Sequence, residues 1–292
     1  DGTVAELLDR HGQQGKLRRY LWEPLCLAAL NTAPHHASAQ IFANVLRDSL
    51  GGARADTDLL LPAADLDRVF PSVAADYVRA HGGKIRLATR VEQIRPQLPI
   101  EGELFDRVIL ALAPQHTASL LAGQPETAAI AAILADYTYE PIGTAYAGYP
   151  PEVSLPCPML GLDGGREGGL GQWVFDRGTL CATPGFMSFV LSAQGTWDQR
   201  DNEALVATLH GELEDALARK LPRPLWHWVS RERRATFSCR PYLPRPAAQT
   251  PLRDLWLAGD YTCADYPATL EGAVRSGIVA ARGAVRSRLA SQ

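Results

Sequence analysis

Residues 255–281, which read LWLAGDYTCADYPATLEGAVRSGIVAA, constrain the fold more than any other part of this chain. Their four apolar opening residues predict a strand that ends at Gly259 and Asp260, and an eight-residue link then leads to Thr269, where a helix can begin. Small residues line one face of that helix at spacings of three and four: Ala273, Gly277, Ala280, Ala281 and Ala284. Such a face can approach a sheet or a bound molecule closely, and the helix start offers unpaired amide groups to it. Ordinary packing in an α/β protein would use the same pattern, so the residues alone leave both interpretations open.

Composition excludes several classes of protein. The 292 residues are 46% hydrophobic and 21% charged, so the chain can bury a substantial core in one large or two ordinary domains. A formal net charge of -3 and a pI near 6.2 provide no basic surface for nucleic acid. The five cysteines are scattered without a C-x-x-C pair, which is typical of a reduced cytoplasmic protein and argues against a disulfide framework or a metal site.

Hydrophobic periodicity predicts a mixed α and β architecture. Helices are expected within residues 15–50, 72–80 and 205–217, and Thr3 and Glu6 have the spacing of a capping box before a short helix. One set of strands is expected in a single sheet with residues 255–258: residues 84–87, 90–94 and 107–112. A second, antiparallel set is expected in the middle of the chain, with a glycine-rich hairpin loop at 161–171: residues 171–176, 188–192 and 225–229.

Three motifs resemble those of a known superfamily. The order A-G-D, P-A-T-L-E-G-A and S-G within residues 258–277 is similar to the closing flavin motif of the flavin amine oxidase and phytoene desaturase superfamily. LATRVEQI at 87–94 resembles the strand whose valine backbone pairs with adenine, and FDRVILA at 105–111 resembles the strand before the crossover out of the cofactor domain. Within the superfamily, the segments at 21–31, 40–51 and 171–178 resemble the hydroxysqualene dehydroxylase family most.

The resemblance implies an α/β (α+β) fold of two domains. An incomplete Rossmann-like sheet would bind FAD, and an antiparallel sheet with helices would form the substrate domain. The expected division assigns residues 59–113 and 251–292 to the FAD-binding domain and residues 1–58 and 114–250 to the substrate domain. No G-x-G-x-x-G turn occurs among the 25 glycines, although the superfamily holds the adenosine diphosphate half of FAD on such an amino-terminal turn. We therefore expect the chain to be a fragment that lacks this segment.

The same resemblance assigns the candidate binding residues. Asp260 would accept hydrogen bonds from ribityl or ribose hydroxyls, and Val91 would pair with adenine. The remaining cofactor contacts would come from close backbone approach around the helix start: Gly259, Thr269, Leu270, Gly272 and Ala273. Tyr266 and Pro267 would face the substrate. The alternatives are a turn cap for Asp260, helix packing for the residues at the helix start, and core packing for Tyr266.

Candidates for a catalytic acid are fewer. Asp176 follows the strand at 171–176, although an Asp-Arg-Gly sequence is typical of a solvated turn. Asp48 lies on the helix expected at 40–50, where exposure to solvent is the alternative. The seven histidines show no catalytic or metal-binding spacing, so we assign no base and no metal ligand.

The implied reaction is the reductive dehydroxylation of hydroxysqualene to squalene, with hydride from reduced flavin. The implied partners are a long apolar isoprenoid and an external electron donor. A substrate that partitions into lipid also suggests peripheral contact with the inner face of the membrane. The alternatives are an amine oxidase, a protoporphyrinogen oxidase, a phytoene desaturase-like enzyme, or a non-catalytic remnant that does not hold FAD.

Overall fold

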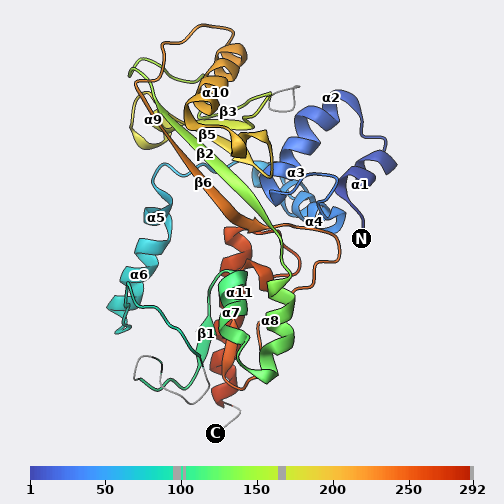
Figure 1. The fold of residues 1–292 in the computed structure, drawn as a ribbon, viewed down its shortest axis with the longest axis vertical. Coiled ribbons are helices and arrows are strands. Elements are labelled where there is room, and N and C mark those ends of the chain that lie inside the picture. Colours follow the sequence, from blue (N-terminus) through green and yellow to red (C-terminus); the bar gives the residue numbers. More distant parts are fainter. Residues whose placement is uncertain (95–99, 101–102, 164–168, 290–292) are drawn as a thin grey trace. The chain divides into compact units, whose positions relative to one another are not determined.

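A computed structural model describes residues 1–94, 100, 103–163 and 169–289 (Figure 1). The chain divides into two compact units. The first unit comprises Asp1–Gly52, Thr89–Tyr139 and Thr236–Gln292, and the second comprises Ala53–Ala88 and Glu140–Ala235. In the part of the chain that is described, none of the helices has the length and apolarity needed to cross a lipid bilayer.

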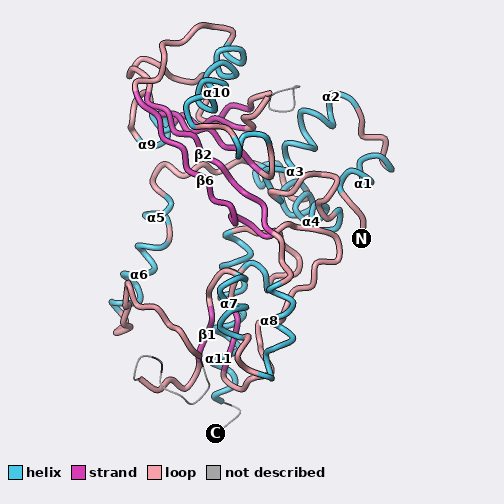
Figure 2. The backbone as a smooth tube through the Cα atoms, in the orientation of Figure 1, coloured by secondary structure: helices cyan, strands magenta, loops and turns pink. Residues whose placement is uncertain are grey.

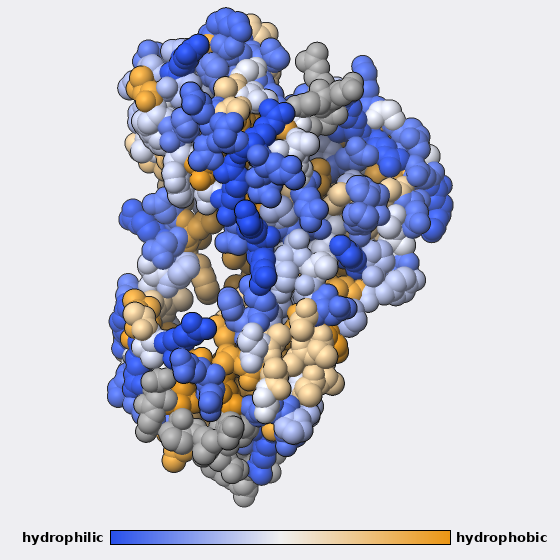
Figure 3. Space-filling view, viewed as in Figure 1, coloured by the Kyte–Doolittle hydropathy of each residue, from blue (hydrophilic) through white to orange (hydrophobic). Residues whose placement is uncertain are grey.

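A two-stranded parallel sheet organises the first unit. β1 (Val108–Leu110) pairs with β7 (Leu255–Leu257) in a register that places Ile109 opposite Trp256. All three residues of β7 are buried, as expected for a parallel strand covered on both faces. α11 (Leu270–Leu289) packs against β7 through Trp256, Ala258, Ala280 and Ala284. Apolar surface gathers around β1 and over α8 (Figure 3).

Helices supply most of the core of the first unit. The capping box of Thr3 and Glu6 is present at the start of α1, as predicted. A single apolar cluster joins the amino-terminal helices to β1, β7 and the pair α7 and α8. The helical elements of this unit are α1 (Val4–Arg10), α2 (Gly15–Leu17), η1 (Arg18–Trp22), α3 (Glu23–Leu30), α4 (Ala39–Leu50), α7 (Pro114–Leu121), η3 (Pro125–Thr127), α8 (Ala128–Ala135), η5 (Asp260–Thr262) and α11.

The second unit contains most of a five-stranded sheet in the order β3-β4-β5-β2-β6, in which β2 and β6 run side by side (Figure 2). The strands are β2 (Tyr139–Gly148), β3 (Met159–Gly161), β4 (Trp173–Asp176), β5 (Phe186–Ser192) and β6 (Trp226–Phe237). Leucines of α10 (Asn202–Leu217) pack in the same core cluster as residues of β2, β4 and β5. The other helical elements are η2 (Arg54–Thr57), α5 (Leu66–Val69), α6 (Pro71–Ala80), α9 (Arg177–Cys181) and η4 (Thr196–Gln199).

Several predicted elements are confirmed. The strand at 107–112 pairs with the strand at 255–258, and α6, α10, β4, β5 and β6 fall at the predicted places. β3 and β4 pair antiparallel on either side of the glycine-rich loop, whose residues 164–168 lie outside the described part of the chain.

Two predicted strands are wrong. Residues 84–87 and 90–94 have β-type composition, yet the structure describes no strand there. A strand exists only when a neighbour accepts and donates its backbone hydrogen bonds, and β1 and β7 pair with each other rather than with these segments.

The compact units also differ from the expected domain division. Residues 1–52 and 114–139 lie in the same unit as β1, β7 and α11. The assignment of each segment to a cofactor or substrate domain stays a prediction.

Candidate functional site

The candidate site lies at the carboxyl ends of β1 and β7. Because the two strands are parallel, the segments after Leu110 and after Leu257 leave the sheet at the same edge. Ligands of open α/β sheets bind at this edge. Gly259 and Asp260 follow β7 there, and α7 begins at Pro114 after β1. The two segments meet where the Tyr261 hydroxyl lies 3.2 Å from Thr117 Oγ1.

Gly259 holds the turn in a conformation that other residues rarely adopt. Its φ is +154°, and a Cβ at this position would lie 2.3 Å from Cε1 of Tyr261, which is fully buried. The Gly259 amide donates to Ser276 Oγ at 2.8 Å, and Ser276 Oγ donates to the Ala273 carbonyl at 2.6 Å. The turn is therefore tied directly to the first part of α11.

The start of α11 is built as the sequence predicts. Thr269 Oγ1 accepts a hydrogen bond from the Gly272 amide at 3.1 Å, which caps the helix. The earlier amides, those of Leu270 and Glu271, have no partner within an α-helix by its geometry. Leu270 itself is 75% exposed.

The predicted small-residue face of α11 is partly wrong. Ala280 and Ala284 are buried as expected, but Ala281 is exposed and a Cβ on Gly277 would contact nothing within 4 Å. The buried face runs instead along residues spaced by four, which the structure places at Gly272, Ser276, Ala280 and Ala284. Ser276 belongs to this face because its hydroxyl is satisfied by the Gly259 amide and the Ala273 carbonyl.

Asp260 carries a partly buried carboxyl group. Burial raises its pKa, while the Tyr261 amide and the positive charge of Arg245 act in the opposite direction. A carboxylate that is poorly solvated is stabilised by any ligand that donates hydroxyl hydrogen bonds to it. This property matches the role that the sequence predicts for Asp260.

Asp48 and Tyr266, which are 218 residues apart, are hydrogen-bonded. The Tyr266 hydroxyl donates to Asp48 Oδ2 at 3.0 Å, and Arg47 Nε donates to Asp48 Oδ1 at 2.8 Å. The Arg47 hydrogen bond and the Tyr266 hydrogen bond lower the pKa of Asp48. A carboxyl group with a lowered pKa is ionised at neutral pH, so Asp48 is a poor proton donor. Pro267, which follows Tyr266 in the sequence, is buried.

Replacing Tyr266 with phenylalanine is expected to raise the pKa of Asp48 toward its ordinary value, because one of two donors is lost. A lowered folded pKa stabilises the fold above the unfolded pKa, and this stability is lost as the pH falls through the folded pKa. The variant should therefore lose less stability on acidification, by a small amount because the group is exposed. NMR titration of the carboxyl carbon measures the pKa, with the exposed Tyr20→Phe as control. An unchanged pKa in Tyr266→Phe would contradict the expectation.

Asp176 has a structural role. It is 1% exposed, its Oδ1 accepts the Thr179 amide at 3.0 Å, and its Oδ2 accepts the Leu155 amide at 3.0 Å. It thus caps α9 and fixes the loop before β3. These two hydrogen bonds account for the residue without a catalytic function.

Val91 borders a pocket of about 790 Å³ along β1. The pocket is lined on one side by residues 89–92 and on the other by residues 108–112, and His116 and Ser119 of α7 complete it. Val91 also packs against the core of the first unit. Its predicted contact with adenine is compatible with this position and stays a prediction.

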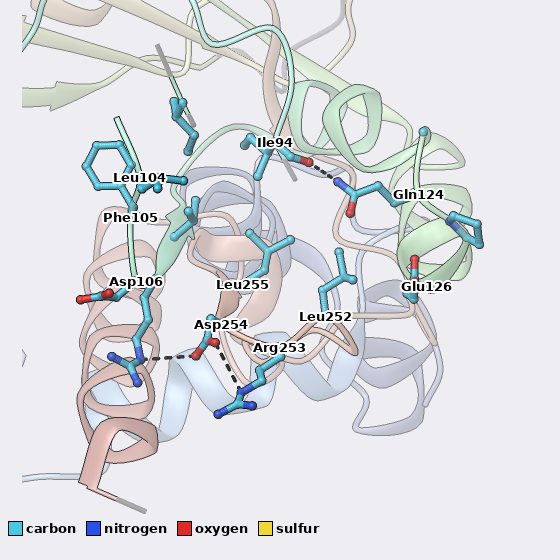
Figure 4. A pocket seen from close by; sticks show the side chains of 15 residues that line it. Ile94, Leu104, Phe105, Asp106, Gln124, Glu126, Leu252, Arg253, Asp254 and Leu255 are labelled. Atoms are coloured by element: carbon cyan, nitrogen blue, oxygen red, sulfur yellow. Dashed lines mark hydrogen bonds and ion pairs between the residues drawn. The ribbon is translucent and has the colours of Figure 1, made fainter. Parts of the chain in front are cut away.

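Another pocket, of about 780 Å³, lies at the opposite ends of the two strands (Figure 4). Asp254 forms ion pairs of 3.5 Å with Arg107 and Arg253 there, and the Gln124 side chain donates to the Ile94 carbonyl. Three of its charged side chains, those of Arg107, Arg253 and Asp254, are therefore already paired with one another. Since ligands of such sheets bind at the carboxyl ends, we place the candidate site at Asp260 rather than in this pocket.

Comparison with known proteins identifies the family. The family described as flavin containing amine oxidoreductase matches residues 1–285. The chain belongs to the flavin-containing amine oxidoreductase family. This confirms the superfamily and the fold class predicted from the motifs, and it makes a flavin the cofactor class.

Curated relatives within the flavin-containing amine oxidoreductase family include hydroxysqualene dehydroxylases. The protein of Rhodopseudomonas palustris is 31% identical over 289 residues, which cover 94% of this chain and 64% of the relative. The proteins of Sinorhizobium fredii and Zymomonas mobilis are 30% and 28% identical to this chain, and the matched regions cover 61% and 62% of their own lengths. The chain thus spans less than two thirds of the length of these relatives.

Solved structures of the same fold are more distant in sequence. An oxidoreductase from Methanosarcina mazei superposes with a TM-score of 0.68 at 14% identity, covering 97% of this chain and 68% of the other. Cyclohexylamine oxidase from Brevibacterium oxydans has a TM-score of 0.64 at 15% identity, covering 98% and 68%. At these identities the likeness shows the fold alone.

The residues at the candidate site fit a flavin. Asp260 is a partly buried carboxyl group that a hydroxyl donor would stabilise. Gln115 Oε1, just after β1 at the same edge, is buried and has no hydrogen-bond partner among the described residues. A ligand with hydroxyl groups and a ring that carries N–H donors could donate hydrogen bonds to the Asp260 carboxylate and to Gln115 Oε1.

Replacing Asp260 with asparagine is expected to stabilise the chain without ligand while weakening flavin binding. A raised folded pKa means that wild-type stability falls as the pH rises from the ordinary aspartate pKa of about 3.9 through the raised value. The variant should lack this loss, so its advantage in urea unfolding should appear above that range and vanish below about pH 4. Flavin binding should weaken by about 1.5–3 kcal/mol, the value of a hydrogen bond to a charged group. The exposed Asp136→Asn is the control, and an advantage that persists at acid pH would contradict the explanation.

Three residues of the site were not predicted. Ser276 takes its buried position through its hydrogen bond to the Gly259 amide, which no local pattern marks. Tyr261 follows the A-G-D motif directly, but its hydrogen bond to Thr117 has no local signal. Arg245 lies in a loop and contacts the turn through main-chain carbonyls, so no motif marks it.

Proposed function

We propose that this protein is an FAD-dependent oxidoreductase that removes the allylic hydroxyl of hydroxysqualene to give squalene. The observation that carries the proposal is the turn after β7, where Gly259 and Asp260 meet the capped start of α11 within a flavin-containing family. The curated relatives with identities of 28–31% are hydroxysqualene dehydroxylases.

The residues of the site would bind and orient the cofactor. Asp260 would accept the ribityl hydroxyl groups, and the amides at the start of α11 would face the electron-rich edge of the ring. Bound reduced FAD would supply hydride, and an external donor would supply its electrons. Tyr266 and Pro267 would lie on the substrate side. The lowered pKa of Asp48 and the two amide hydrogen bonds of Asp176 argue against either residue as the acid.

FAD titration of the purified chain tests the cofactor. Flavin fluorescence should be quenched on binding, and flavin absorbance should stay with the protein through gel filtration. The Gly123→Ala variant, with open space around its new methyl group, is a matched control that should bind equally. Protein that stays colourless after incubation with FAD would count against a flavin site in this chain.

Product analysis tests the reaction. Under anaerobic conditions with chemically reduced FAD, hydroxysqualene should be converted to squalene. Conversion of amines or of protoporphyrinogen under aerobic conditions, without any squalene, would favour the alternative oxidases instead.

We also propose that the protein contacts the membrane surface peripherally. Failure of the protein to float with anionic liposomes would contradict this proposal.

A further inference from the structure

Arg245 binds the turn of the candidate site through two hydrogen bonds. It lies in the loop after β6, and its Nη1 donates to the carbonyl oxygens of Asp260 and Cys263, each at 3.3 Å. These two carbonyls stand at the start and just past the end of η5 (Asp260–Thr262). The guanidinium group of Arg245 therefore forms hydrogen bonds with both ends of the turn that carries Asp260.

Both ends of Arg245 are themselves fixed. Its guanidinium carbon lies 4.4 Å from the centre of the Phe237 ring, a cation–π contact. The Tyr137 hydroxyl donates to the carbonyl of Pro244, the residue before Arg245, at 2.6 Å. Tyr137 and Phe237 also pack edge to face at 5.7 Å. The arginine is thus held at its backbone and at its head group.

The charge of Arg245 acts on Asp260. The titratable groups that interact electrostatically with the Asp260 carboxyl group are Arg245, Tyr137 and Tyr261. Arg245 is the cation among them, and it lowers the pKa that burial raises. Its hydrogen bonds to the turn go to main-chain carbonyls and another goes to the Cys239 side chain, so it provides charge without using the carboxylate oxygens that a ligand would need.

We propose that Arg245 is a positioning residue that fixes the η5 turn and places its positive charge near the Asp260 carboxyl group, which would accept the flavin hydroxyl groups. The effects of Arg245 on the turn and on the Asp260 carboxyl group can be measured without any ligand. The effect of Arg245 on flavin binding rests on the proposed function.

Two substitutions separate charge from geometry. Arg245→Gln keeps an amide donor but removes the charge, whereas Arg245→Lys keeps the charge on a single ammonium group. Arg219→Gln is the matched control, because Arg219 is an exposed arginine of the second unit that also donates to a backbone carbonyl, that of Ser154 at 3.0 Å. NMR titration of the Asp260 carboxyl carbon is carried out on the chain without ligand, and FAD binding is then measured by flavin fluorescence.

The expected result is a further rise of the Asp260 pKa in Arg245→Gln, with Arg245→Lys and Arg219→Gln close to the wild type. FAD affinity at pH 7 should fall about tenfold or more in Arg245→Gln and less in Arg245→Lys. A folded Arg245→Gln with the wild-type Asp260 pKa would overturn the proposal.

If Arg245→Gln does not fold, amide exchange in Arg245→Lys decides. The amides of Thr262 and Cys263 close the turn by donating to the carbonyls of Gly259 and Asp260, at 3.0 and 3.1 Å. Their exchange should be faster in Arg245→Lys than in Arg219→Gln, and equal exchange would overturn the proposal. A wild-type chain that titrates as expected but binds no FAD would refute the proposed function and leave the role of Arg245 in the turn supported.

Discussion

Gly259→Ala is expected to lower the free energy of unfolding by about 2–6 kcal/mol and to abolish flavin binding. The new Cβ would lie 2.3 Å from Cε1 and 2.7 Å from Cδ1 of Tyr261. Tyr261 cannot move aside easily, because it is fully buried and its hydroxyl contacts Thr117 Oγ1. The loss combines the strain of a φ of +154° in alanine, about 1–3 kcal/mol, with a similar cost of overpacking.

Urea unfolding followed by circular dichroism measures the effect on stability. Gly123→Ala is the control within the same unit, because its φ is not in the left-handed region and its Cβ would contact nothing within 4 Å. It should stabilise the chain slightly, by about 0.4–1 kcal/mol, through the unfolded state. Equal stability of Gly259→Ala and the wild type would show that the turn differs from the one described.

Gly283→Ala and Gly277→Ala are expected to change stability in opposite directions, although both glycines lie on α11. A Cβ on Gly283 would lie 2.2 Å from Cη2 and Cζ3 of Trp256, which is 8% exposed on β7. Overpacking of this kind costs about 1–3 kcal/mol. A Cβ on Gly277 meets open space, so alanine there should stabilise the helix by up to about 1 kcal/mol.

The pair forms its own control, since the substitution and the helix are the same. Thermal unfolding and near-ultraviolet circular dichroism, which reports the environment of Trp256, should distinguish them. Stabilisation by both substitutions would mean that α11 does not pack on β7 through Gly283.

Local patterns predicted the site better than they predicted its surroundings. The strand, turn and helix of residues 255–281 are contiguous in sequence, so their order and the cap at Thr269 could be predicted directly. The phase of α11 could not, because Ser276 takes a buried position only through its hydrogen bond to Gly259. β2 was also missed, since its buried positions include Ala145 and Ala147 rather than large β-branched residues.

Long-range contacts account for the remaining differences. The segments at 84–94 have strand composition, but hydrogen bonding to a neighbour decides whether a strand forms. The hydrogen bond between Asp48 and Tyr266 joins residues 218 positions apart, and Asp176 accepts a hydrogen bond from the Leu155 amide, 21 positions before it. No local pattern carries such information, so the acid candidates could be judged only from the structure.

The hydroxyl of Ser276 limits how the site can move. It accepts from Gly259 and donates to Ala273, so the end of β7 and the second turn of α11 are coupled through one atom. A displacement of the strand end from α11 would break the hydrogen bond between the Gly259 amide and Ser276 Oγ. Rearrangement that admits or releases a ligand is therefore expected in residues 263–269, between η5 and the helix cap, while the strand end and the helix behave as one rigid body.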